Sequence, residues 1–112
     1  MSAGGFVAVL VIELHFPDAG SLKSKRKDLA SIKAQLHGRL GAAVAEVDHQ
    51  DTWQRSTLTA ALTGGSLATL SAAADRIERW LDARWPDGVR VQRVVVSLEE
   101  LREVVPRFGT EI

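Results

Sequence analysis

The chain has 112 residues, of which 46% are apolar and 25% charged, so it can bury the core of one domain but not of two. Its 14 basic and 14 acidic residues cancel, which excludes the global positive field of a strong nucleic-acid binder and leaves only local patches. No cysteine is present, which excludes disulfides, thiolate metal sites and cysteine nucleophiles. We expect a single domain over residues 1–112, with an ordered core at about 5–101 and a tail at 102–112.

The longest apolar run, residues 6–12, is too short to span a bilayer. No basic segment precedes it and no cleavage-like signal follows it, so it does not resemble a secretory signal. We therefore expect a cytoplasmic protein that does not enter a membrane.

The first half of the chain predicts a strand, a helix and a hairpin. Residues 6–16 are rich in valine, leucine and isoleucine and predict a strand that stops at Pro17. Ser21 can cap a helix that ends near Gly38 and Gly41. The apolar positions of this helix share one arc: Leu22, Leu29, Ile32, Leu36 and Leu40. Residues 42–47 and 56–63 predict the two strands of a hairpin around a polar segment.

The second half of the chain predicts a helix and a final strand. Ser66 can cap the helix, whose apolar positions recur at spacings of three and four. These positions are Leu67, Leu70, Ala74, Ile77 and Leu81. Residues 85–88 break the helix, and residues 89–98 predict a fourth strand, whose valine run at 94–96 suggests cover on both faces.

The order strand, helix, strand, strand, helix, strand predicts an α+β fold, the ferredoxin-like βαββαβ sandwich. Its four-stranded antiparallel sheet carries both helices on one face. In this topology the end of the first strand, the start of the first helix, the turn between the second and third strands and the end of the second helix lie at one end of the domain. The unusual polar residues are therefore expected to converge there.

Four cations lie in the first two turns of the first helix: Lys23, Lys25, Arg26 and Lys27. The helix dipole disfavours cations at this position, so their placement fits a site that binds an anion such as RNA phosphate, or an acidic protein surface. The alternative is a solvated face that Asp18 and Asp28 partly neutralise. Lys25 projects within the apolar arc, where snorkelling of its long side chain towards solvent is the expected arrangement.

Residues 46–58 carry more polar side chains than a turn needs, and the first strand ends in two more. The candidates for this polar cluster are Glu13, His15, Asp48, His49, Asp51, Trp53 and Arg55. One interpretation is a network that stabilises the turn, with backbone amides bound by Asp48 and Asp51 and with Arg55 paired to Glu13 or Glu46. Another is a binding or catalytic site in which His49 transfers protons. For Trp53 we expect burial in the core or at an interface.

Metal and catalytic chemistry are weakly specified in this segment. Asp48, His49 and Asp51, with Glu13 or His15, are residue types that bind divalent cations, but nothing in the sequence fixes their geometry. We assign no metal and no cofactor. Ser56 or Thr57 with His49 matches no triad signature, so we assign no catalytic residue. The sequence leaves enzymatic activity open and favours a non-enzymatic protein.

The sheet face away from the helices is predicted to carry Val7, Val9 and Val11 beside Thr57 and Thr59. Because three exposed valines on a central strand favour burial, we expect a homo-oligomer, with a dimer as the first choice, to cover this face. The alternative cover is the C-terminal tail through Val104, Val105 and Phe108. The face lacks the outward aromatic residues with which the RNA-recognition version of this topology stacks bases.

Three stretches together resemble the YlxP-like family of small uncharacterised bacterial proteins: residues 13–15 (Glu-Leu-His), residues 21–27 (Ser-Leu-Lys-Ser-Lys-Arg-Lys) and residues 46–58. The resemblance covers about residues 6–100 and implies a ferredoxin-like fold without an established activity. Family members are often encoded beside genes for translation initiation and ribosome maturation, which implies a translation-associated role. Ser24 stands where a glutamate is common in the family, which leaves the helix start more positive.

We therefore expect a non-enzymatic, oligomeric accessory factor that binds RNA or a ribosomal partner through the basic helix start. Two alternatives remain open. One is a small-molecule- or metal-dependent enzyme that uses His49 with Asp48 or Asp51. The other is a purely structural protein in which the polar segment sets the hairpin and an oligomer contact.

Overall fold

The structure is a computed structural model that describes residues 4–17 and 19–104. Its elements follow in the order β1 (Phe6–His15), α1 (Leu22–Gly38), β2 (Ala43–Asp48), β3 (Arg55–Gly64), α2 (Leu67–Arg84), β4 (Val89–Ser97) and α3 (Leu98–Val104). The four strands form one antiparallel sheet in the order β2-β3-β1-β4. The predicted α+β, ferredoxin-like fold is confirmed.

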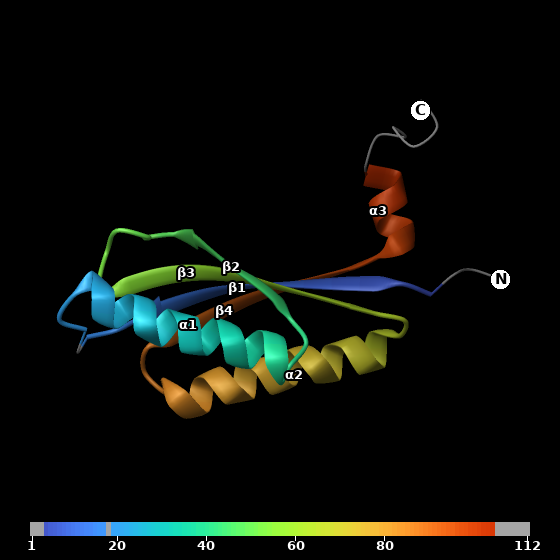
Figure 1. The fold of residues 1–112 in the computed structure, drawn as a ribbon. Helices are drawn as coiled ribbons and strands as arrows, with labels where there is room; N and C mark the ends of the chain where they lie inside the picture. The colour runs from blue at the N-terminus through green and yellow to red at the C-terminus, as the bar shows by residue number, and fades with distance from the viewer. Residues whose placement is uncertain (1–3, 18, 105–112) are drawn as a thin grey trace.

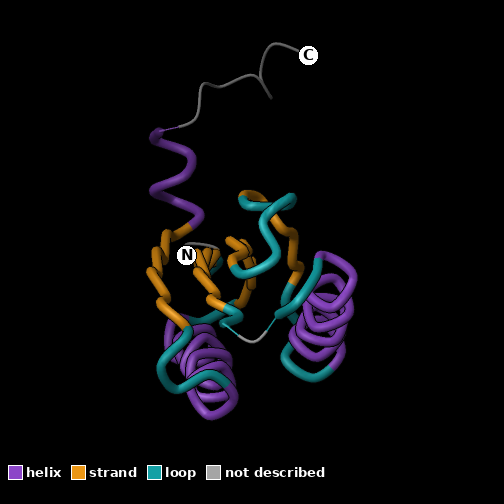
Figure 2. The backbone as a smooth tube through the Cα atoms, turned by 90° about the vertical axis from the view of Figure 1, so that its left-hand side faces the viewer, coloured by secondary structure: helices purple, strands orange, loops and turns teal. Residues whose placement is uncertain are grey.

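The core lies between the sheet and the two long helices, α1 and α2, which cover one face of the sheet (Figures 1 and 2). Alternate residues of β1 and β3 point to this core, as the period of two in their sequences predicts. Those of β1 are Ala8, Leu10, Ile12 and Leu14, and those of β3 are Leu58, Ala60 and Leu62. The apolar arcs of α1 and α2 supply the other half: Leu29, Ile32, Leu36, Leu70, Ala74, Ile77 and Leu81.

Both predicted serine caps are confirmed. The Ser21 hydroxyl accepts a hydrogen bond from the Ser24 backbone N–H at 3.1 Å, and the Ser66 hydroxyl accepts one from the Thr69 backbone N–H at 3.1 Å. Each bond satisfies one of the amides that a helix N-terminus leaves without an internal partner. The caps fix where α1 and α2 leave the strands and so hold the start of α1 at the end of the sheet. None of the described helices is long and apolar enough to cross a membrane.

Helix α3 was not expected from the sequence, which predicted strand up to residue 98 and no regular structure beyond it. The Ser97 hydroxyl accepts a hydrogen bond from the Glu100 backbone N–H at 3.0 Å, and the Glu100 carboxylate accepts one from the Ser97 backbone N–H at 2.9 Å. This reciprocal pair is a capping box, so the chain turns into a helix at Leu98. Helix α3 leaves the sheet on the side away from α2 (Figures 1 and 2).

The sheet face opposite α1 and α2, called the open face below, consists of the residues that alternate with the core positions. Its apolar members include Val7, Val9, Val11, Ala61, Val94 and Val96, and its polar members include Thr57, Thr59, Thr63 and Gln92. In the antiparallel register Val9 lies between Ala61 of β3 and Val94 of β4. Val9 is 36% exposed and Val94 is 60% exposed. The predicted outward valine stripe is therefore present. Val105 and Phe108, the alternative cover, lie outside the described residues.

Candidate functional site

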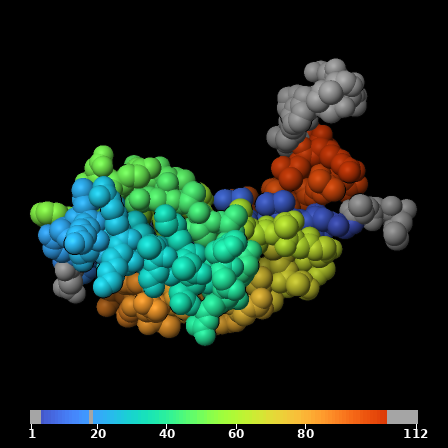
Figure 3. All heavy atoms as spheres, viewed as in Figure 1, coloured from blue at the N-terminus to red at the C-terminus, as the bar shows by residue number. Residues whose placement is uncertain are grey.

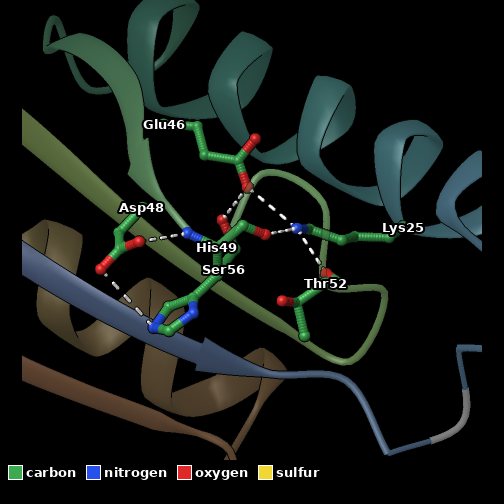
Figure 4. A network of polar contacts seen from close by, with 6 residues as sticks. All are labelled: Lys25, Glu46, Asp48, His49, Thr52 and Ser56. Atoms are coloured by element: carbon green, nitrogen blue, oxygen red, sulfur yellow. Dashed lines mark hydrogen bonds and ion pairs between the residues drawn. The ribbon is translucent and has the colours of Figure 1, made fainter.

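Lys25 is the most deeply buried charged residue of the described chain, with no exposed surface. Its ammonium group donates hydrogen bonds to the backbone carbonyl of His49 and, at 2.6 Å, to that of Thr52 (Figure 4). It also lies 3.1 Å from the Glu46 carboxylate, which accepts a further hydrogen bond from the Ser56 hydroxyl at 2.6 Å. Three oxygens therefore meet the three donors of the buried cation, which offsets its desolvation.

This geometry corrects the assignment of Lys25 to the anion-binding set. An ammonium group that is enclosed by protein oxygens cannot reach an RNA phosphate or an acidic partner. The snorkelling interpretation is wrong for the same reason, because the side chain points into the domain and not to solvent. Lys25 lies in the apolar arc of α1 because its side chain points towards the sheet and reaches the carbonyls of the loop between β2 and β3.

The loop between β2 and β3 is held from both sides. Lys25 binds its two carbonyls from α1, and the Asp48 carboxylate accepts a hydrogen bond from the His49 backbone N–H at 2.7 Å. His49 adopts a left-handed backbone conformation with φ of 62°. The Thr52 N–H closes the turn on the His49 carbonyl at 3.1 Å. The turn-stabilising part of the predicted network is confirmed for Asp48.

The predicted pairing of Arg55 with Glu13 or Glu46 is not found among the described residues, since Glu46 pairs with Lys25. The polar cluster instead divides into two groups. Glu13, His15 and Arg55 project on the open-face side of β1 and β3, where His15 and Arg55 are cross-strand partners. The remaining members, Asp48, His49, Asp51 and Trp53, lie at the end of β2 and in the loop that follows it, and Asp51 is exposed there. Among the described residues no ion pair joins the two groups.

Three cations at the start of α1 remain available to a ligand: Lys23, Arg26 and Lys27 are all exposed. The loop that Lys25 holds against α1 carries Trp53, which is 49% exposed, so it is not buried in the core, and its burial at an interface stays a prediction. Figure 3 shows the start of α1 and the hairpin tip gathered at one end of the molecule. Trp53 and the three cations are called the basic end below.

A pocket of about 330 Å³ adjoins the basic end, between the end of β1, the start of α1 and the end of α2. Its wall includes an aromatic group in which the Trp85 ring lies 6.4 Å from Phe16 and 5.9 Å from Trp80, both edge to face. The Arg84 guanidinium lies 5.2 Å from the centroids of both tryptophan rings, a cation–π arrangement. The sequence analysis did not single these residues out, although Trp-Pro-Asp-Gly after an amphipathic helix marks the position.

His49 and Asp48 are the residues on which a metal site in this loop would depend. The His49 ring Nε2 lies 3.8 Å from the Asp48 carboxylate, whose other oxygen is bound to the His49 backbone. Within residues 4–17 and 19–104, no three histidine, aspartate or glutamate side chains come close enough together to hold a metal ion. The hydrogen bonds of His49 are made by its backbone, whose N–H donates to Asp48 and whose carbonyl accepts from Lys25 and Thr52.

Comparison with known proteins gives a family without an assigned activity. Residues 7–96 match the family model described as "Protein of unknown function (DUF503)". The chain is 32% identical over 82 residues to "Uncharacterized protein YlxP" of Bacillus subtilis (strain 168), an alignment that covers 73% of this chain and 85% of that relative. Among solved structures, the de novo designed protein Foldit4 is similar with a TM-score of 0.51 and 13% identity over 80% of this chain and 96% of that one, which supports the fold alone. The chain therefore belongs to the YlxP-like family, DUF503.

Proposed function

We propose that this protein is a non-enzymatic accessory factor that binds structured RNA, such as that of the ribosome, through its basic end. The observation that carries the proposal is the burial of Lys25 under the loop between β2 and β3. That contact fixes the loop that carries the exposed Trp53 at the end of the domain where α1 begins with three exposed cations. An aromatic ring and a set of cations therefore lie at the same end of the molecule before any ligand binds (Figure 3).

Cations and an aromatic ring together suit single-stranded or looped RNA. Lysine and arginine side chains neutralise phosphates, and the amides at the start of α1 add a positive dipole end. An exposed tryptophan offers a ring face on which a base can stack, at about 1–3 kcal/mol per base. Because the loop is already ordered by Lys25, Trp53 loses little additional freedom on binding.

The proposed factor is oligomeric, with the open face as its contact surface. Val7, Val9 and Val11 of this face form an apolar strip on the central strand β1, and their partners on β3 are Thr63, Ala61 and Thr59. Exposed apolar patches of this kind mark interaction sites. The open face and the basic end are distinct surfaces, so assembly leaves the RNA contact free.

The test is a salt series of binding between the purified protein and ribosomal subunits or structured ribosomal RNA. Neutralising Lys23, Arg26 and Lys27 to glutamine should lower the affinity and reduce the slope of log K against log salt by about 2–3, since each phosphate contact contributes about 0.7–0.9. The matched control neutralises three exposed arginines elsewhere, Arg39, Arg76 and Arg79. The control changes the net charge equally and should leave the slope near that of the unmodified protein.

A Trp53→Ala variant separates stacking from general electrostatics. It should weaken binding without changing the salt slope, because it removes no charge. Binding that is insensitive to salt, or lost equally in the control, would contradict the proposal. Absence of binding at low salt would move the search to small ligands of the pocket beside Trp85.

A further inference from the structure

The open face carries a strip of apolar residues between threonines and Gln92. Val94 is the most exposed large apolar residue of the described sheet, at 60%, and it lies on the edge strand β4 beside Val9 of the central strand β1. Contiguous exposed apolar side chains of this kind mark surfaces that bind a partner. In Figure 3 the surface above β1 dips between the hairpin at one end and α3 at the other.

Helix α3 stands at one end of this dip and rises on the same side of the sheet (Figures 1 and 3). The Leu98 backbone N–H is bound to the Gly5 carbonyl at 2.7 Å, which fixes where the helix starts. Its seven residues at 1.5 Å each give a length of about 10 Å, which equals the usual spacing of about 10 Å between two packed sheets. The helix carries three exposed acids, Glu99, Glu100 and Glu103, and one exposed cation, Arg102.

The other end of the same sheet has a groove of about 300 Å³ at the start of β4. Arg55 and Arg90 lie on it with His15, Glu13 and Asp87. Neither arginine takes part in an ion pair within the described part of the chain, whose ion pairs are made by Lys25, His49 and Arg93. The groove therefore offers two guanidinium groups together with two carboxylates, Glu13 and Asp87, at the end of the sheet opposite to α3.

We propose that a second copy of this chain covers the open face, with the two-fold axis in the interface, across the strands and near Val94. In β4, Val94 lies four residues from Arg90 and four from Leu98. A two-fold rotation at Val94 therefore carries the start of α3 over Arg90 of the partner subunit. Each acidic helix then lies in the arginine groove of the other copy. The proposal rests on the oligomeric part of the proposed function and specifies its geometry.

A two-fold axis along the strands is an alternative way to pair the open faces symmetrically. It would place the two α3 helices, each with three acids and one cation, at the same end of the dimer. Like charges on the two helices would then oppose association, whereas contact of each helix with the two arginines of the partner's groove stabilises it. The acids of α3 and the positions of Arg55 and Arg90 thus favour the axis across the strands.

Sedimentation equilibrium of charge-reversal variants tests this arrangement. Glu99→Arg with Glu103→Arg should raise the dimer dissociation constant by about tenfold or more, and so should Arg55→Glu with Arg90→Glu. Combining all four changes should restore association to within about threefold of the unmodified protein, because the same pairs reform with reversed sign. The matched control reverses Arg76 and Arg79, on the solvent side of α2, and should leave the dissociation constant unchanged.

Val94→Asp provides a second measurement at the proposed axis and should give a folded monomer, since the side chain is already exposed in one chain. A protein that is monomeric at all concentrations would overturn the proposal. So would a dimer that Val94→Asp dissociates but charge reversal leaves unaffected. RNA binding measured on the same samples separates the two proposals: an RNA-binding monomer overturns only the dimer, and a dimer without RNA affinity overturns only the RNA contact.

Discussion

Lys25 and Glu46 join α1 to β2 through a single buried contact, with the lysine Nζ 3.1 Å from the glutamate Oε2. The same carboxylate oxygen accepts a hydrogen bond from Ser56 on β3. The lysine in turn binds two carbonyls of the loop that connects these strands. One cation therefore links a helix, two strands and a turn, and the order of the hairpin depends on it.

Replacing Lys25 with methionine should destabilise the protein by about 3 kcal/mol or more, because it leaves a largely buried carboxylate and two carbonyls without their donor. The side chain of methionine fills a similar volume, so the effect is electrostatic and not a cavity. Urea unfolding measures the loss. The same substitution at Lys23, which is exposed on the same helix turn, is the control and should change stability by less than about 0.5 kcal/mol.

Glu46→Gln provides a check on which partner matters. If the ion pair dominates, Glu46→Gln alone should also destabilise the protein, and the two substitutions combined should cost less than the sum of the single losses. Strict additivity would show that the two carbonyls, and not the carboxylate, hold the lysine. Hydrogen exchange of the loop amides reports whether the loop opens in each variant.

A prediction for His49 follows from its left-handed backbone, with φ of 62°. Asparagine adopts this conformation readily, whereas a β-branched residue does not. His49→Asn should stay within about 0.5 kcal/mol of the unmodified stability, while His49→Val should lose about 1–2 kcal/mol. Thermal unfolding compares the two. A greater loss for asparagine than for valine would show that the imidazole ring, and not the backbone, is required.

The elements and their order could be predicted because apolar periodicity and capping residues are local signals. Ser21 and Ser66 cap their helices as predicted, and the alternating residues of β1 and β3 face the predicted sides. Helix α3 was missed although Ser97 and Glu100 have the spacing of a capping box, because the valine run before them favoured a continuing strand.

The site was harder to predict because it depends on contacts between elements that are distant in sequence. A lysine in an apolar arc is compatible with snorkelling or burial, and only the position of the β2–β3 loop decides. The acceptors of Lys25 include two backbone carbonyls, and every residue has a backbone carbonyl, so the sequence does not indicate which ones bind the lysine. For the same reason the sequence could not show that Trp53 stays exposed or that Arg55 lies apart from Glu46.

Arg93 ties β4 to α2, since its guanidinium donates to Asp75 at 2.8 Å and also pairs with Glu78. The hydrogen bond that Arg93 donates to Asp75, followed by its contact with Glu78, raises the pKa of Arg93 above its ordinary value, so the arginine stays charged at all working pH values. Arg93→Met should destabilise the protein by about 1 kcal/mol, a modest effect because the group is 26% exposed. Arg79→Met, at an exposed position of α2 that forms no ion pair among the described residues, should be neutral within about 0.5 kcal/mol.

Salt provides a second readout for Arg93. Because partly exposed ion pairs are screened, the difference between Arg93→Met and the unmodified protein should shrink in about 1 M NaCl, where the screening length is about 3 Å. Melting temperatures measured at low and high salt give the comparison. A difference that stays the same in high salt would indicate that the packing of the arginine stem, and not its charge, stabilises the contact between β4 and α2.

The capping box of α3 makes this helix sensitive to acid. The Ser97 backbone N–H, followed by the Ser97 hydroxyl, lowers the pKa of Glu100 below its ordinary value. A carboxyl whose pKa is lower in the folded than in the unfolded state contributes stability above its unfolded pKa, and that contribution is lost as the pH falls through the folded value. Helix α3 should therefore fray as the pH falls below about 4.3, the ordinary glutamate pKa.

Backbone chemical shifts of residues 98–103 measure the helix content of α3 across this pH range. Glu100→Gln, which cannot titrate, should remove the pH dependence. A titration that persists in Glu100→Gln would assign it to Glu99 or Glu103, the other acids of the same short helix.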